Sequence, residues 1–154
     1  MSSISYEKIY GSFLSNITDY KIATQDEDVT TEQLADYLHK AVGTPYIRAL
    51  FISIELDDDN AVLNYEIKNP DVNGDDDFMI HMFGKAMVYE WVLPQVNKTS
   101  LLAQMFSGKE VKWYSNANHM AELRGIKEDT ELEVRRMIRD RGFISNEYLK
   151  GGTT

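Results

Sequence analysis

The chain has 154 residues, a formal net charge of −9 at pH 7 and no cysteine. With 43% hydrophobic and 11% aromatic residues, it has enough apolar surface for one domain around a single core. The lack of thiols excludes disulfides, thiolate zinc sites and a cysteine nucleophile, and the acidic balance disfavours a general phosphate binder. We find no apolar run of membrane-spanning length and no secretory signal pattern, so we expect a soluble, untargeted protein.

The N-terminal third predicts two amphipathic helices. Apolar residues recur at spacings of three and four between positions 6 and 17, which indicates one apolar face of a helix. After a polar loop, Thr30 and Gln33 have the spacing of a capping box that opens a second helix, with apolar positions from 34 to 42. Gly43 and Pro45 predict where this second helix stops.

The middle of the chain predicts a β-hairpin at residues 50–67. Apolar and polar residues alternate along 50–56 and again along 61–67, and "DDDN" between them is typical of a turn. The sequence indicates no third strand, and a lone hairpin is only marginally stable, so we expect it to pack on helices or pair with another subunit. The candidate inter-subunit residues are Ile52, Ile54, Leu63 and Tyr65.

A broadly apolar central helix is predicted to begin near Phe78. Pro94 cannot donate a hydrogen bond to the Glu90 carbonyl, so we expect the helix to kink or end within a turn of Trp91. A short helix ending at Gly108 should follow.

The C-terminal third then predicts an extended link and a long last helix. The link is "KEVKWYS", and Ser115 or Asn116 can cap the helix, which Gly142 ends. The predicted structural anchors are Trp91, Pro94, Trp113 and Tyr114. The fold class is therefore mainly α: a bundle of about four to five helices with one inserted β-hairpin, a long C-terminal helix and a tail.

One acidic loop resembles the start of a calcium-binding loop at Asp71, Asn73 and Asp75. The pattern then fails, because Asp76 stands at the sixth position, where glycine makes the turn, and Met82 at the twelfth, where a bidentate glutamate belongs. We interpret the acidic residues as favourable charges at the start of the next helix.

The sequence contains no pattern typical of catalysis. His39, His81 and His119 lie in separate helices without metal-ligand spacing, so structural roles are expected. There is no phosphate-binding glycine loop and no nucleophile elbow, and carboxylates in turns are solvated rather than tuned as general acids. The sequence predicts no catalytic residue, no metal and no cofactor, and hence no enzyme.

Two segments carry a family resemblance. The stretch "MVYEWVLPQVNKTSLLAQMFSGKEVKWYSNANHMAEL" and the stretch "YEKIYGSFLSNITDYKI" resemble the neck adaptors, or head-to-tail connector proteins, of tailed bacteriophages. The similar parts are residues 6–22 and 79–126, with looser agreement over 34–42. The hairpin at 50–67 and the tail beyond Gly142 depart from the pattern.

This resemblance implies a structural virion protein located at the head-tail neck, and in the host cytoplasm during assembly. Neighbouring copies would form a ring, commonly dodecameric, that binds the portal protein on one side and a stopper or tail-terminator protein on the other. DNA would pass through without sequence-specific binding, helped by a negative lumen that repels phosphate; no membrane is involved. A stopper or tail-completion protein of the same region, and a non-viral protein-interaction module, remain alternatives.

The end of the chain is the candidate portal-binding region. We divide the chain into an adaptor domain at 1–142 and a docking tail at 143–154. Arginines gather at the end of the last helix, and apolar residues follow before the closing "GGTT", a combination suited to an acidic, hydrophobic cleft. The candidate portal or neck interface residues are Arg135, Arg136, Arg139, Arg141, Phe143, Ile144, Tyr148 and Leu149.

Overall fold

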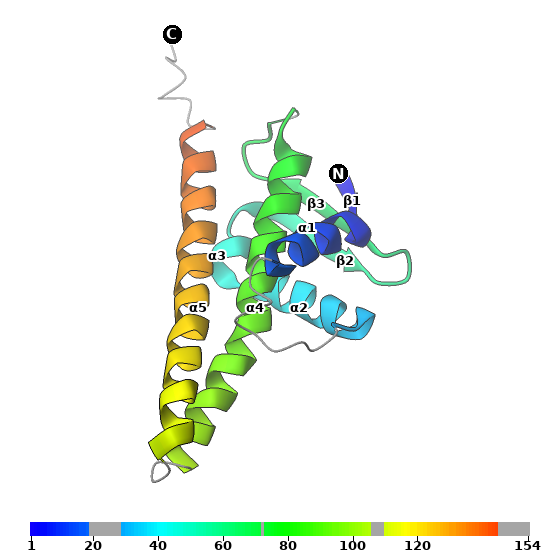
Figure 1. Cartoon of the computed structure of the whole chain (residues 1–154). Coiled ribbons are helices and arrows are strands. Elements are labelled where there is room, and N and C mark those ends of the chain that lie inside the picture. The colour runs from blue at the N-terminus through cyan, green and yellow to red at the C-terminus, as the bar shows by residue number, and fades with distance from the viewer. Residues whose placement is uncertain (19–28, 72, 106–109, 145–154) are drawn as a thin grey trace.

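The computed structural model is mostly helical with a small antiparallel sheet (Figure 1), which confirms the mainly α prediction. It describes residues 1–18, 29–71, 73–105 and 110–144. The elements in chain order are β1 (Ser2–Ser5), α1 (Tyr6–Thr18), α2 (Thr31–Gly43), α3 (Pro45–Arg48), β2 (Phe51–Asp57), β3 (Val62–Ile67), α4 (Asp75–Met105) and α5 (Glu110–Ile144).

The start of α2 forms as its sequence predicts. The Thr30 side chain accepts a hydrogen bond from the backbone N–H of Gln33, and the Gln33 side chain accepts one from the backbone N–H of Thr30. This reciprocal pair satisfies two donors that a helix start leaves free. Gly43 is the last residue of α2, and Pro45 opens the short α3, where its missing N–H is harmless.

The predicted hairpin is present, but it belongs to a three-stranded sheet. The strand order is β1-β3-β2, with both pairings antiparallel. Strand β1 was missed because Ser2–Ser5 contains one apolar residue, Ile4, which lies opposite the buried Leu63. One apolar residue in four does not make the alternating pattern that predicts a strand.

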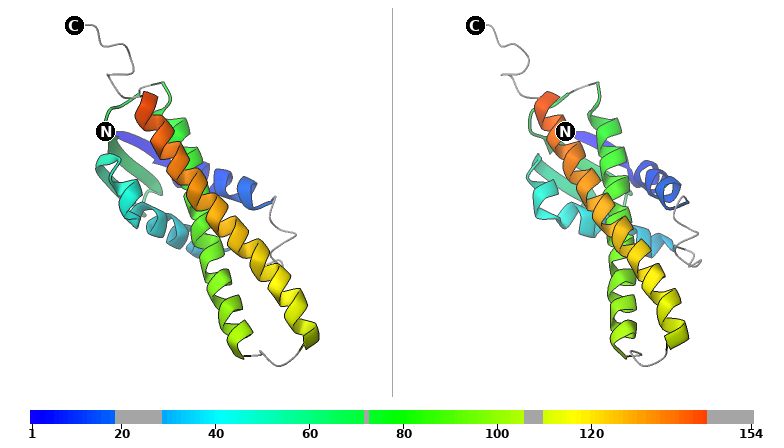
Figure 2. Two further views of the ribbon diagram at one scale, coloured as in Figure 1. Left: turned by 90° about the vertical axis from the view of Figure 1, so that its left-hand side faces the viewer. Right: turned by 60° about the vertical axis from the view of Figure 1, so that its left-hand side comes forward.

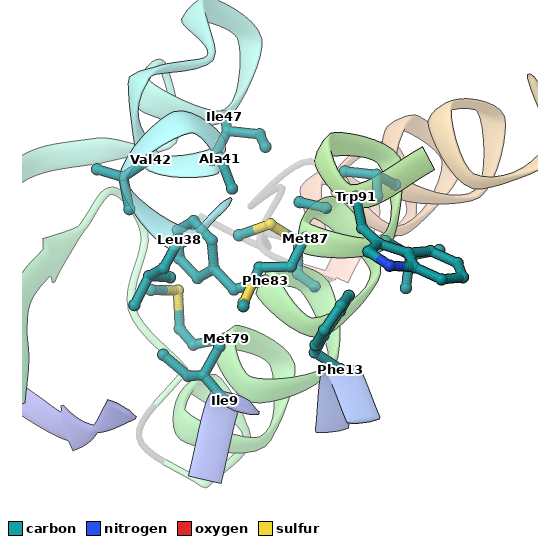
Figure 3. Close-up of a cluster of buried hydrophobic side chains, with 14 of the residues drawn as sticks. Ile9, Phe13, Leu38, Ala41, Val42, Ile47, Met79, Phe83, Met87 and Trp91 are labelled. Atoms are coloured by element: carbon teal, nitrogen blue, oxygen red, sulfur yellow. The ribbon is translucent and has the colours of Figure 1, made fainter. Parts of the chain in front are cut away.

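Helix α4 is the centre of the fold. It contacts α5 on one side and α1, α2 and β1 on others. Figure 3 shows Phe83 and Met87 of α4 among apolar side chains from α1 and α2, with Leu38 of α2 close by, and all three are fully buried. A helix enclosed in this way needs apolar residues around most of its circumference, as its sequence has.

Helix α4 continues through Pro94, so of the two outcomes expected at this residue, a kink or an end, the end is wrong. Pro94 lacks the N–H that would bond to the Glu90 carbonyl. The carbonyl of Trp91, next to Glu90 in the chain, accepts a hydrogen bond from Gln95 Nε2 at 3.1 Å. A side chain thus donates to the helix backbone close to Pro94. Packing along α5 supports the helix further. The predicted separate helix before Gly108 is therefore the end of α4 as far as Met105, and Gly108 itself lies outside the described residues.

Helix α5 is longer than predicted at both ends. The segment "KEVKWYS", predicted as extended chain, is helical from Glu110 onward, and Ser115 and Asn116 lie inside the helix rather than capping it. Gly142 does not end it either, since the helix runs to Ile144. The β-branched and aromatic residues of "KEVKWYS" are weak helix formers, which is why the sequence predicted extended chain there.

The second half of α4 and the first half of α5 form a projecting arm. Figures 1 and 2 show these two segments side by side and extending beyond the body made by α1, α2, α3 and the sheet. In the described part of the chain, no helix has an apolar stretch long enough to cross a membrane.

Candidate interaction surfaces

Of the four candidate arginines near the end of α5, three are exposed and one, Arg141, is buried. It is only 8% exposed and donates to Asp75 Oδ1 at 2.6 Å and to the Asn69 carbonyl at 3.0 Å. The Arg141 guanidinium also lies 5.5 Å from the centre of the Phe78 ring. Its assignment to a portal interface is therefore corrected: the charge ties α5 to the start of α4 within the subunit.

The other three arginines are on the surface. Arg135 lies 4.1 Å over the Tyr46 ring and 3.2 Å from the Glu131 carboxylate, so it is partly held by its own subunit. Arg139 lies 3.6 Å from Asp140. Together with Arg136, these exposed side chains stay candidates for contacts with another molecule.

The apolar tail falls largely outside the structure. Tyr148 and Leu149 lie outside the described residues. Phe143 and Ile144 form the last residues of α5, with their side chains outside the described part. The proposed docking tail thus begins directly from a helix that Arg141 fixes to the body.

The four hairpin candidates also divide. Ile52 is 63% exposed, at the irregular step between Phe51 and Ser53 where β2 shifts register against β3. A bulge of this kind re-aims a side chain, which explains how Ile52 faces out within an otherwise alternating strand. Ile54 is half-buried and packs against the core.

Leu63 and Tyr65 belong to the core of the subunit. Leu63 is 0% exposed and Tyr65 2%. The Tyr65 hydroxyl donates to Asp76 Oδ1 at 2.5 Å, and burial, followed by this hydrogen bond, raises the pKa of Tyr65. Their assignment to an inter-subunit contact is corrected, because a side chain enclosed by its own chain is not available to a neighbour.

A polar cluster that the sequence did not indicate joins three elements. Asp58, in the hairpin turn, accepts a hydrogen bond from the Tyr6 hydroxyl at 2.7 Å, and His39 Nε2 of α2 lies 2.9 Å from it. The bond from Tyr6, and then the one from His39, lowers the pKa of Asp58. Burial of the Tyr6 hydroxyl, followed by its hydrogen bond to Asp58, raises the pKa of Tyr6. The cluster fixes the hairpin turn to α1 and α2.

The predicted anchors have different environments. Trp91 is 8% exposed and meets the Phe13 ring edge-on, with centroids 6.3 Å apart, so it fastens α4 to α1 as an anchor should. Pro94 is exposed within α4. Trp113 and Tyr114 lie in α5, and their side chains are outside the described part.

The acidic loop that resembles a calcium site has an internal use. One oxygen of Asp75 accepts from Arg141 and the other accepts the backbone N–H of Asp71 at 2.7 Å. Both oxygens of the Asp75 carboxylate are therefore used within the subunit: one closes the loop and the other binds Arg141 of α5. Within the described ranges, no group of three or more His, Asp or Glu side chains is arranged to hold a metal ion.

Comparisons of the chain with protein-family models, with curated proteins and with solved structures gave no match.

Proposed function

We propose that the chain is a non-enzymatic structural subunit of the neck of a tailed bacteriophage. Copies of it would form a ring, commonly dodecameric, that joins the head portal to the tail around the DNA channel. The proposal begins from the resemblance of residues 6–22 and 79–126 to neck adaptors, and it is supported by where those segments lie in the fold.

The observation that carries the proposal is that the two resembling segments pack directly on each other. The first contains α1 and the second most of α4 and the first half of α5. Phe13 meets Trp91 across this boundary, and Gly84 of α4 lies against Ser12 of α1. Segments about sixty positions apart in the chain thus make one structural unit, as a shared scaffold would require.

The hairpin departs from the resemblance and would carry what is particular to this subunit. It is part of the sheet beside α1 (Figure 1), and α5 ends at Ile144, away from the projecting arm. In the proposed ring, the tail and the exposed arginines Arg135, Arg136 and Arg139 would bind the portal, and a stopper or tail-terminator protein would bind below. The net charge of −9 would let DNA pass without adhering to the wall.

Electron microscopy of particles made without this chain tests the proposal. Loss of a neck ring should leave DNA-filled or emptied heads and free tails that do not join, and supplying the chain in trans should restore joining. Normal tailed, infectious particles in its absence would refute the proposed function.

A further inference from the structure

The outer face of α5 is a separate exposed surface with an unusual composition. The inward face of the helix consists of buried residues; these are Leu123, Ile126, Thr130, Val134 and Arg141. Roughly opposite, Leu132 is 60% exposed. Leu132 is one of the residues that line a shallow groove of about 400 Å³; the lining residues are Asp129, Leu132, Glu133, Arg136, Met137 and Asp140.

Charges of opposite sign flank Leu132 along this face, and the carboxylates of Glu133 and Asp140 line the same groove. Asp129 precedes Leu132 by three positions and Arg136 follows it by four, so all three lie on one stripe of the helix. With a rise of 1.5 Å per residue, the two charges are about 10 Å apart along the axis, too far to pair with each other. The stripe therefore presents an acid, an apolar side chain and a base in that order.

We propose that two copies of this chain pair through this face, with their α5 helices antiparallel and Leu132 packed against Leu132 of the second copy. Reversing the helix direction brings Asp129 of each copy near Arg136 of the other, with an offset of one residue, or about 1.5 Å along the axis. A two-fold contact of this kind is self-complementary, because one patch supplies both partners of every pair. The two symmetric ion pairs then flank a central apolar contact.

A second copy fits this face better than an occupant of one charge sign. A basic partner would meet Arg136, and an acidic partner would meet Asp129, Glu133 and Asp140. The antiparallel copy instead places the acidic end of each stripe against the basic end of the other. Leu132 also gains a partner of its own kind. The pairing goes beyond the proposed neck function and does not depend on it, since the purified protein alone should show it.

Analytical ultracentrifugation of the full chain provides the test. The wild type should dimerise with rising concentration, and Asp129→Arg or Arg136→Asp alone should weaken the dimer Kd by about tenfold or more, because each puts two like-charge pairs into the interface. An equimolar mixture of the two single variants should recover a heterodimer of near wild-type affinity, since both pairs are again opposite in sign. The matched control is Glu55→Arg, an equal charge change on the exposed side of β2.

The mixture of the Asp129→Arg and Arg136→Asp variants is the decisive measurement. A wild type that stays monomeric up to about 1 mM, single variants that dimerise as the wild type does, or single variants that weaken but show no recovery on mixing would each overturn the proposed pairing. Circular dichroism establishes that the variants keep the fold, as expected for exposed positions. None of these outcomes bears on whether the chain is a neck protein.

Discussion

Arg141 links the end of α5 to the start of α4 by a buried ion pair. Its guanidinium and the Asp75 carboxylate are 2.6 Å apart, with side chains only 9% and 11% exposed. Carbonyls of Lys68 and Asn69 accept further hydrogen bonds from it. A charge enclosed in this way is stabilising only while its partner remains.

Arg141→Met should lower the free energy of unfolding by about 3–5 kcal/mol, because it leaves the Asp75 carboxylate buried without its partner. Urea denaturation measures the change. Asp75→Asn combined with Arg141→Met should regain much of the loss, because the amide is neutral and its oxygen can still accept the backbone N–H of Asp71. Arg139→Met on the surface should change stability by only about 0.5 kcal/mol. Equal effects of the Arg141 and Arg139 substitutions would contradict this role.

The Tyr6, Asp58 and His39 cluster makes the hairpin anchor dependent on pH. The folded state lowers the pKa of Asp58 from 3.8, so its contribution is present above that pH and is lost as the pH falls through the lowered value. The stability difference between the wild type and Asp58→Asn, measured by urea denaturation, should thus shrink between about pH 6 and about pH 2. Asp59→Asn serves as the control, and an Asp58→Asn difference that stays constant with pH would count against the anchor.

At the scale of elements, α1 and α4 approach closely at Gly84. A methyl group added at Gly84 would lie 2.8 Å from Ser12 Cβ and 3.3 Å from the Phe13 backbone nitrogen. The first distance is shorter than real contacts of this kind, and the second atom is backbone that cannot turn aside. Gly84 is therefore required for the two helices to approach.

Gly84→Ala should destabilise the protein by about 1–3 kcal/mol through overpacking. Gly11→Ala is the matched control, because a methyl group there meets nothing within 4 Å, and it should stabilise α1 by about 0.5–1 kcal/mol. Thermal melting of the two variants should shift in opposite directions. Similar shifts of the same sign would show that the approach of α1 and α4 does not control stability here.

Elements whose signal is local were predictable from the sequence. The capping box at Thr30 needs only residues three positions apart, and the hairpin needs only alternation around a turn. The start of α5 was missed because the β-branched and aromatic residues of "KEVKWYS" have weak local helix preference. Likewise, Asp75 and Arg141 are 66 positions apart, so only the fold shows that they form a pair and that Arg141 is no surface residue.

At the scale of the whole molecule, the sheet offers one exposed apolar residue for assembly. Ile52 is 63% exposed while Ile54 packs on the core, so their roles can be separated. If the hairpin contacts a neighbouring subunit, Ile52→Lys should leave the melting temperature nearly unchanged yet reduce incorporation into particles. Ile54→Lys should lower the melting temperature itself. Particles with normal content of the Ile52→Lys chain would exclude Ile52 from the assembly contact.

The central claim is the position of this chain in the virion. Immunogold labelling of intact particles, with antibodies raised against the purified chain, measures that position directly. We predict gold at the junction between head and tail and on isolated neck complexes. Label confined to the capsid shell or the distal tail, or virions that carry none of the chain, would contradict the assignment.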